Sequence, residues 1–290
     1  MSDQTKGTII KGIGGFYFVD TEYGVFRAKG RGVFKKDGDL LTVGDIVGIS
    51  IKEDGDSVIE SLEPRKNRFD RPPVSNVDKV VVVASASKPE TNTIIIDKLA
   101  VLAELKEALP IICISKTDAA SEKKISYLRE IYEPIYRTIC ISSLNGSGID
   151  DLRSELCACN TVFAGQSGVG KSTLINILAP EAMMETGSIS EKTKRGKHTT
   201  RHVEVFSCEG GRIFDTPGFS SINTDNIEYD KLKEMFPELR EAKSMCKFRD
   251  CMHINEPGCA VLERKEKGMI HQSRYDSYIE ILNEIKRRRK

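Results

Sequence analysis

Short apolar stretches separated by glycine-rich turns fill the first quarter of the chain. They occur at residues 7–20, 23–34, 42–51 and 57–62. Each stretch lacks helical spacing, and short strands between glycines are typical of small closed β-barrels. We therefore expect residues 1–70 to form an oligonucleotide-binding (OB) type of β-barrel. The charged, proline-bearing run 63–73 has no periodicity, which predicts a linker.

A different pattern begins after residue 70. The β-branched run Val77–Ala84 fits a strand buried on both faces, and Asp97 precedes residues 98–109, whose leucines and alanines fall near helical spacing. Further strands are predicted at 110–114, 138–141, 162–164, 203–206 and 212–214, and helices at 123–131, 149–156 and 174–178. This alternation predicts a parallel sheet with crossover helices, so we assign residues 71–224 to a central α/β domain.

The last segment, residues 225–290, has few apolar residues until a helical pattern begins at Ser273. Its apolar positions lie on one helix face, at Tyr275, Tyr278, Ile279, Leu282 and Ile285. We expect a mainly helical C-terminal domain. The helix ends in KRRRK, five consecutive cations that are either solvated or in contact with phosphate groups.

The charge balance argues against a global attraction to nucleic acid. The 290-residue chain has a formal net charge of +1, so any such binding must come from local patches. One candidate patch on the barrel has no acidic residue between its first and last member: Arg27, Lys29, Arg31, Lys35 and Lys36. It is either a solvated hairpin or a local, salt-sensitive RNA contact.

No stretch resembles a leader or a membrane span. The first ten residues, MSDQTKGTII, lack a cationic region followed by a long apolar run, and the longest apolar stretch is near Val80–Ala84. We expect a cytoplasmic protein with no membrane partner.

The eight cysteines divide into two groups. In a cytoplasmic protein they are expected to be thiols or metal ligands, and Cys113 and Cys140 lie in apolar runs that predict buried side chains. Cys157, Cys159 and Cys208 are scattered. The remaining three have a C-x4-C-x-H-x5-C spacing with a histidine: Cys246, Cys251, His253 and Cys259. Three thiolates and one imidazole suit a single structural Zn²⁺, and reduced thiols without a metal are the alternative.

The residues 161–173, TVFAGQSGVGKST, match the G-x-x-x-x-G-K-[ST] template of a phosphate-binding loop. Glycines let successive backbone N–H groups approach phosphate oxygens, and the following helix adds its positive N-terminal end. Lys171 is expected to reach the β- and γ-phosphates, and Ser172 to offer a hydroxyl to Mg²⁺. The expected phosphate-binding residues are Gly165, Gln166, Ser167, Gly168, Val169, Gly170, Lys171, Ser172 and Thr173.

A second motif, SKTD at residues 115–118, predicts guanine specificity. Guanine presents two adjacent donors that the carboxylate of Asp118 can accept, whereas adenine presents neither. The stem of Lys116 would cover the base, and Ser115 stands where such motifs usually have asparagine, which puts the affinity in question. Thr117 completes the motif. Ser142 and Ser143 would present backbone N–H groups to the guanine O6.

A third motif, DTPG at residues 215–218, follows a predicted strand and completes the site. Asp215 would hold Mg²⁺ through water, and the Gly218 N–H would meet the γ-phosphate. Residues 188–201 have the composition of a mobile loop. Thr199 or Thr200, in this loop, would close on Mg²⁺ when triphosphate is bound.

The order of these motifs differs from the usual one. SKTD and SSL precede the phosphate-binding loop, whereas in an ordinary GTPase the guanine motif comes last. Joining the old termini and cutting the chain after DTPG restores the usual sheet, so the sequence predicts a circular permutation. The loop that senses the γ-phosphate then leads directly into the C-terminal segment, and hydrolysis is predicted to move that segment.

With the barrel, SKTD, GQSGVGKS, GKHTTRHVE, DTPGF and the Cys3His cluster in this order, nearly the whole chain resembles a known family. This is the ribosome small subunit-dependent GTPase A family of circularly permuted bacterial assembly GTPases. The resemblance implies hydrolysis of GTP to GDP, stimulated by the 30S subunit, during late maturation of that particle. It also implies contacts of the barrel and the zinc domain with its 16S rRNA, and we expect a monomer.

The catalytic group is not obvious from the motifs. Lys171 and Mg²⁺ would neutralise charge, but Phe219 occupies the position where many GTPases place a glutamine that orients water. We therefore predict slow intrinsic turnover, and His198 is the candidate substitute, since an imidazole can orient or deprotonate water. The alternative is that His198 is only a polar loop residue.

Two other functions remain open. The protein could be mainly a nucleotide-gated RNA-binding module in which hydrolysis serves as a release timer, or an ATP-dependent RNA-remodelling enzyme. Asp118 argues against the second, because adenine would leave its carboxylate unpaired.

Overall fold

The computed structural model describes residues 4–32, 34, 40–52, 56–70, 72–182, 203–215 and 227–288. These residues group into two compact units. The first unit comprises Met1–Lys79, Arg153–Phe163 and Ile175–Phe219, and the second comprises Val80–Leu152, Ala164–Leu174 and Ser220–Lys290. No helix among the described residues is both long and apolar enough to cross a membrane.

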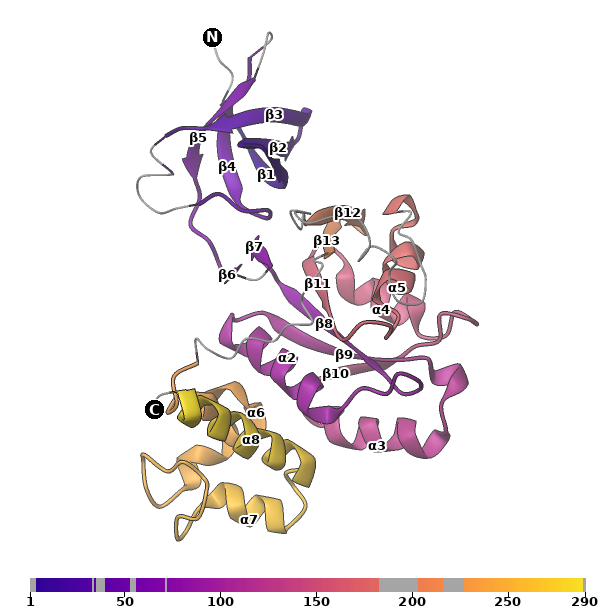
Figure 1. Cartoon of the computed structure of the whole chain (residues 1–290), viewed down its shortest axis with the longest axis vertical. Helices are drawn as coiled ribbons and strands as arrows, with labels where there is room; N and C mark the ends of the chain where they lie inside the picture. Colours follow the sequence, from indigo (N-terminus) through magenta and orange to yellow (C-terminus); the bar gives the residue numbers. More distant parts are fainter. Residues whose placement is uncertain are drawn as a thin grey trace. The chain divides into compact units, whose positions relative to one another are not determined.

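The N-terminal segment forms the expected closed barrel, which has five strands. Its strands are β1 (Gln4–Ile13), β2 (Phe16–Thr21), β3 (Gly24–Gly30), β4 (Ile46–Ser50) and β5 (Ser57–Leu62). They close in the order β1-β2-β3-β5-β4 (Figure 1). Strands β3 and β5 are parallel, whereas the pairs β1–β2, β2–β3, β1–β4 and β4–β5 are antiparallel. Inward-facing strand residues and Leu41, which lies between β3 and β4, form the barrel core: Ile9, Val19, Ala28, Leu41, Val47, Ile49 and Ile59.

The run predicted as a linker contains a small hairpin instead. Strands β6 (Arg68–Asp70) and β7 (Pro73–Ser75) pair antiparallel. The amide of Asn67 donates to the Val77 carbonyl and accepts from the Val77 N–H, and the amide of Asn76 bonds Lys66 N and Gly44 O in the same way. These four amide bonds, together with the buried side chains of Phe69 and Val74, give the run a defined structure, and the linker prediction was wrong for this reason.

The central α/β prediction is confirmed by a six-stranded sheet. It consists of β8 (Lys79–Ser85), β9 (Leu109–Ser115), β10 (Arg137–Cys140), β11 (Asn160–Ala164), β12 (Glu204–Cys208) and β13 (Gly211–Asp215). The strand order is β10-β9-β8-β11-β13-β12, with β9 parallel to β10, β11 parallel to β13, and the edge strand β12 antiparallel to β13. The helices between the strands are α2 (Thr93–Leu105), α3 (Glu122–Tyr132), α4 (Ile149–Leu156) and α5 (Lys171–Leu178).

Helix α2 begins earlier than its apolar pattern indicates. Asn92 is its N-cap and accepts a hydrogen bond from the Ile94 N–H. Asp97, which the pattern places just before the helix, therefore lies inside it and is fully buried. An aspartate in a helix interior requires a polar partner, and that partner comes from the C-terminal region.

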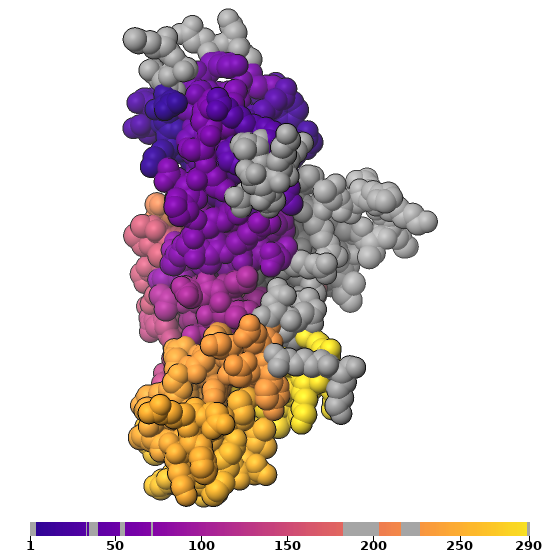
Figure 2. All heavy atoms as spheres, turned by 90° about the vertical axis from the view of Figure 1, so that its left-hand side faces the viewer, coloured from indigo at the N-terminus to yellow at the C-terminus, as the bar shows by residue number. Residues whose placement is uncertain are grey.

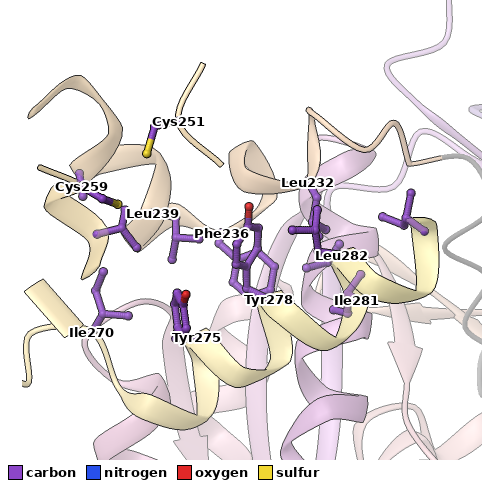
Figure 3. Close-up of a cluster of buried hydrophobic side chains, with 14 of the residues drawn as sticks. Leu232, Phe236, Leu239, Cys251, Cys259, Ile270, Tyr275, Tyr278, Ile281 and Leu282 are labelled. Carbon is purple, nitrogen blue, oxygen red and sulfur yellow. The ribbon is translucent and has the colours of Figure 1, made fainter. Parts of the chain in front are cut away.

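The C-terminal region is mainly helical, as predicted. After the 3₁₀ turn η4 (Leu232–Met235) come α6 (Pro237–Ala242), α7 (Ala260–Glu266) and α8 (Gln272–Arg288). Tyr275, Tyr278, Leu282 and Ile285 of α8 are buried, and Figure 3 shows several of them pointing into one apolar cluster that Val101 of α2 also joins. In the space-filling view, the orange C-terminal residues lie directly against magenta residues of the same unit (Figure 2).

Candidate nucleotide-binding site and metal centre

The predicted phosphate-binding loop connects β11 to α5. Three of its glycines have positive φ angles, +148° at Gly165, +80° at Gly168 and +105° at Gly170, which side chains of L-residues rarely adopt. A Cβ atom on Gly165 would lie 2.4 Å from the Val83 carbonyl oxygen, so the loop also needs glycine to approach β8. The backbone thus has the curvature that an anion-binding loop requires.

The lysine of this loop folds back over it. Lys171 is the first residue of α5, and its Nζ donates to the carbonyl oxygens of Gly165 and Gln166, at 2.7 Å each. The ammonium group is therefore held at the loop from which it would contact a phosphate. Ser172 and Thr173 follow in the first turn of α5 and are half-buried.

The guanine motif is tied to the phosphate-binding loop by two side chains. Ser115 is buried, and its hydroxyl donates to the Val169 carbonyl oxygen at 2.7 Å. Lys116 has a φ of +58°, and its Nζ donates to the Gly168 carbonyl oxygen at 2.7 Å and to the Lys88 carbonyl oxygen at 2.9 Å. The shorter serine at the usual asparagine position therefore still links the two loops.

Asp118 is exposed and is oriented by a neighbouring loop. The Ser142 hydroxyl donates to Asp118 Oδ1 at 2.5 Å, and the same oxygen of Ser142 lies 3.3 Å from the backbone nitrogens of Leu144 and Asn145. Thr117 begins a short 3₁₀ turn and Ser143 is half-buried. The structure thus brings SKTD and the SSL loop together, as the sequence predicts.

Part of the predicted site lies outside the described residues. This holds for the candidate catalytic His198, for Thr199 and Thr200, for Gly218 and for Phe219. Asp215 is described and is the last residue of β13. Since β11 and β13 run parallel with Val162 opposite Phe214, Asp215 and the end of β11 belong to the same edge of the sheet.

The four predicted zinc ligands converge in the C-terminal region. The ligand atoms of Cys246, Cys251, His253 and Cys259 all lie within 4.8 Å of one another. His253 Nδ1 is 3.6 Å from the Cys246 sulfur and 3.4 Å from the Cys259 sulfur. Neighbouring ligand atoms of a tetrahedral zinc site, with bonds of about 2.0 to 2.3 Å, lie about 3.5 Å apart, so the residues fit such an ion.

The surroundings of the cluster favour neutral ligands unless a cation is bound. Burial raises the pKa of the Cys251 thiol to about 12 and lowers the pKa of His253. The buried His253 Nε2 has no hydrogen-bond partner within the described part of the chain. Tyr275 donates its hydroxyl to the His253 carbonyl at 2.8 Å, which anchors the ligand loop to α8.

Comparison with known proteins agrees with these motifs. Residues 62–225 match the model of the RsgA GTPase family, and residues 6–59 match that of the RsgA N-terminal domain. The chain is 40% identical over 290 residues to the small ribosomal subunit biogenesis GTPase RsgA of Caldanaerobacter subterraneus subsp. tengcongensis, covering 99% of this chain and 98% of that protein. The chain belongs to the RsgA GTPase family.

Other members of the RsgA family are similarly close over their whole length. The RsgA protein of Geobacillus thermodenitrificans is 43% identical over 288 residues, with 98% of each chain covered. The crystal structure of YloQ, a circularly permuted GTPase, matches with a TM-score of 0.84 at 38% identity and covers 99% of this chain and 96% of that one. YjeQ from Thermotoga maritima matches with a TM-score of 0.86 at 35% identity, covering 98% and 99%.

The basic patch on the barrel is partly neutralised by two acidic side chains, one in β5 and one just before it. Asp56 accepts from Arg27 at 2.6 Å and lies 3.1 Å from Lys29, and Glu60 pairs with Arg31 at 2.5 Å. Arg27 and Lys29 also lie over the ring of Phe16, at 4.9 and 4.7 Å from its centroid. Lys35 and Lys36 are outside the described residues.

Sequence reasoning missed one loop of the candidate nucleotide site. Residues 85–92, between β8 and α2, supply the Lys88 carbonyl that holds Lys116, and a Cβ atom on Gly168 would lie 3.4 Å from Pro89. Contacts through backbone carbonyls leave no sequence motif. The position of this loop directly after the first strand of the permuted domain was the only available signal.

Proposed function

We propose that the protein hydrolyses GTP to GDP and phosphate during late maturation of the 30S ribosomal subunit, with stimulation by that subunit. The observation that carries this proposal is the joining of SKTD to the phosphate-binding loop by Ser115 and Lys116, in the permuted motif order of the RsgA family. The curated relatives are named as small ribosomal subunit biogenesis GTPases.

Each motif has a role in this reaction. Asp118, held by Ser142, accepts the two adjacent guanine donors, and Lys116 covers the base. Backbone N–H groups of the phosphate-binding loop and Lys171 contact the phosphates and neutralise charge as the bond to the γ-phosphoryl group breaks. Ser172, Asp215 and Thr199 or Thr200 would hold Mg²⁺, which neutralises charge on the β- and γ-phosphates when bound, and the Gly218 N–H would meet the γ-phosphate.

The same proposal covers the partners and the domain limits. Residues 1–70 and 225–290 contact 16S rRNA on either side of the GTPase domain, residues 71–224, and the protein acts as a cytoplasmic monomer on the subunit. The cations and the ring of Phe16 on the barrel support an RNA contact, since cations attract phosphate and rings stack on bases. Cys246, Cys251, His253 and Cys259 hold one structural Zn²⁺.

Steady-state hydrolysis of GTP and ATP, with and without purified 30S subunits at two salt concentrations, tests the reaction. We expect slow GTP turnover alone, a many-fold increase with the subunit, and no ATP turnover. GTP binding without stimulation would favour the nucleotide-gated RNA-binding module, and ATP turnover would contradict the guanine assignment.

The Asp118→Asn variant tests the base specificity. An amide donates where the carboxylate accepts, so xanthine, which presents an oxygen in place of the 2-amino group, becomes the better partner. We expect tighter binding of xanthosine triphosphate than of GTP in a competition assay. The guanine assignment fails if the variant keeps the preference of the unmodified protein.

The His198→Ala variant tests the catalytic candidate. We infer that His198 orients the attacking water, in place of the glutamine whose position Phe219 occupies. Loss of a positioned general base reduces turnover by about 10²- to 10⁴-fold, so subunit-stimulated kcat should fall within that range while GDP affinity is retained. Unchanged stimulated turnover would show that His198 is only a polar loop residue.

A further inference from the structure

One arginine of the C-terminal helix is completely buried against the GTPase fold. Arg274, in the first turn of α8, has an exposed fraction of 0%. Its Nη1 donates to Asp97 Oδ1 of α2 at 2.6 Å, and its Nε and Nη2 donate to the carboxylate of Glu238 of α6 at 2.8 and 3.2 Å. The guanidinium group also lies over the rings of Phe236 and Tyr136, 4.7 and 5.5 Å from their centroids.

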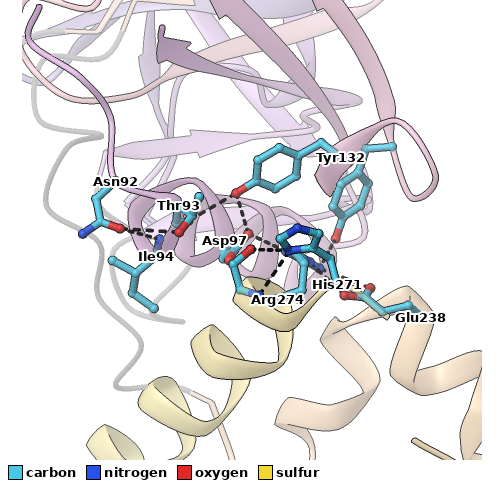
Figure 4. A network of polar contacts seen from close by, with 10 residues as sticks. Asn92, Thr93, Ile94, Asp97, Tyr132, Glu238, His271 and Arg274 are labelled. Atoms are coloured by element: carbon cyan, nitrogen blue, oxygen red, sulfur yellow. Dashed lines mark hydrogen bonds and ion pairs between the residues drawn. The ribbon is translucent and has the colours of Figure 1, made fainter. Parts of the chain in front are cut away.

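Asp97 connects Arg274 to the start of α2 through the hydroxyl of Tyr132. The Tyr132 hydroxyl donates to Asp97 Oδ1 at 2.9 Å and lies 3.3 Å from the carbonyl oxygen of Thr93, the first residue of the helix (Figure 4). Burial raises the pKa of Asp97, and the charge of Arg274 acts in the opposite direction. A buried charge that loses its partner is strongly destabilised, so Arg274 fixes where Asp97, and with it α2, can lie.

The loop that precedes α2 belongs to the nucleotide site. Residues 85–92 are closed at their base by Thr91, whose hydroxyl accepts from Ser85 N and whose N–H donates to the Ser85 carbonyl. The Lys88 carbonyl of this loop accepts from Lys116 Nζ, which also donates to Gly168 of the phosphate-binding loop. The start of α2 therefore sets the position of a carbonyl that orients the guanine-covering lysine.

We propose that Arg274 is a positioning residue for the guanine-nucleotide site, acting through Asp97 and the start of α2 on the 85–92 loop that holds Lys116. The inference rests on the proposed function, since it assumes that a guanine nucleotide contacts Lys116 and Asp118. It makes docking of the Cys3His region onto α2 a condition for full nucleotide affinity. Any partner that pulls α8 away from α2 would then weaken nucleotide binding, by reciprocity of the two equilibria.

Arg274→Met in the full-length protein tests this proposal. It keeps an unbranched apolar stem but removes the bonds to Asp97 and Glu238. The Kd for GDP, measured by calorimetry on protein shown to be folded, should rise about 2- to 30-fold, the range of effects along such contact networks. Hydrogen exchange of peptides covering 85–92 and 115–118 should increase.

Two control variants separate positioning from a general loss of stability. Arg240→Gln breaks another arginine contact to α2, the 3.0 Å bond to Glu104 near the other end of the helix. Val261→Ala removes apolar volume from α7, in the C-terminal apolar cluster that also contains Phe236. Both should leave the Kd for GDP and the exchange of residues 85–92 unchanged, although Val261→Ala lowers the unfolding temperature.

If the single variant does not fold, the double variant Asp97→Asn, Arg274→Met is used in its place for the same measurement. It removes both buried charges together, which is often tolerated, while the bond between the two residues stays broken. We expect it to fold and to bind GDP as weakly as the single variant. The inference is overturned if the double variant binds GDP as tightly as the unmodified protein, or if Val261→Ala loses as much GDP affinity as the Arg274 variants. If the unmodified protein does not bind GDP, the proposed function is overturned instead.

Discussion

The serine of the guanine motif illustrates how a departure from a common pattern can preserve its physical role. Asparagine at this position offers an amide, whereas Ser115 offers one hydroxyl. In this chain the hydroxyl donates to the Val169 carbonyl oxygen at 2.7 Å and has another oxygen, that of Ala84, at 3.5 Å. A buried carbonyl oxygen without a donor is costly, so this single bond supports the conformation of the phosphate-binding loop.

Ser115→Ala is therefore expected to weaken nucleotide binding. Loss of the bond to Val169 should cost about 1 kcal/mol, which corresponds to a rise of about fivefold in the Kd for GDP. Calorimetric titration with GDP measures this change. Ser126→Ala, which removes an exposed hydroxyl from α3, is the matched control, and equal affinities for the two variants would contradict the role of Ser115.

Single residues also show where sequence reasoning stops. The phosphate-binding glycines, Lys171 and the four clustered ligands follow from local spacing, because their chemistry requires neighbours in the sequence. Arg274 and Asp97 are 177 positions apart and have no such spacing. A charged residue in a helical pattern predicts an exposed face, so only the packing of α8 on α2 reveals that both are buried.

At the level of elements, the C-terminal region combines a metal cluster with an apolar core. The cluster Leu232, Phe236, Tyr278 and Leu282 packs beside the cysteines, and Figure 3 shows Cys251 and Cys259 at one edge of it. The loop carrying His253 has two further anchors: Tyr275 donates to its carbonyl, and Glu256 accepts from the N–H groups of Met252 and Ile254. The helices are held by the apolar core, whereas the loop depends on polar bonds such as these and on its metal ligands. Bound zinc would therefore stabilise the loop more than the helices.

Removal of zinc should consequently affect residues 246–259 first. We expect one zinc equivalent per chain by metal analysis, and faster hydrogen exchange of this loop and of α7 after chelation or in Cys259→Ser. The barrel strands, which have an apolar core of their own, serve as the internal reference and should stay protected. Unchanged exchange in the loop after complete metal removal would contradict a structural zinc.

Sequence patterns missed the hairpin β6–β7 and the 85–92 loop, whose contacts are made by side-chain amides and backbone carbonyls. The hairpin β6–β7 follows from Asn67 and Asn76, each of which bonds two backbone groups, and neither belongs to an apolar pattern. The strands and helices of the central sheet were predicted because they bury continuous apolar runs, such as Val80–Ala84.

At the level of the whole molecule, the order of motifs was more informative than their presence. Circular permutation could be predicted because SKTD precedes the phosphate-binding loop, and the match to YloQ, a circularly permuted GTPase, agrees with it. The consequence drawn for the C-terminal segment, that hydrolysis moves it, stays a prediction. Among the described residues, α2 holds that segment through ion pairs of Asp97, Lys98 and Glu104 and through the apolar packing of Val101, so any such motion must break these contacts or move α2 as well.

The charge balance of the barrel leads to a prediction about RNA affinity. With a net charge of +1, the proposed RNA contact would depend on local cations, and Asp56 neutralises part of the patch by pairing with Arg27 and Lys29. The hydrogen bond from Lys29 is the main cause that lowers the pKa of Asp56, so folding favours its charged form. The stabilising contribution of these pairs is present above the ordinary titration range of aspartate and is lost as the pH falls through the lowered value.

Asp56→Asn should therefore strengthen binding to 30S subunits or 16S rRNA. Releasing Arg27 and Lys29 from a carboxylate lets about one more phosphate be neutralised, which steepens the slope of log K against log salt by about 0.7 to 0.9. Relative to 1 M salt, this is a gain of about fivefold at 0.15 M. Glu130→Gln, on the exposed face of α3, makes the same change in net charge away from the patch and should leave the slope unchanged. If both variants alter the slope equally, net charge and not the barrel patch governs the contact, and if neither does, the barrel does not bind RNA through Arg27 and Lys29.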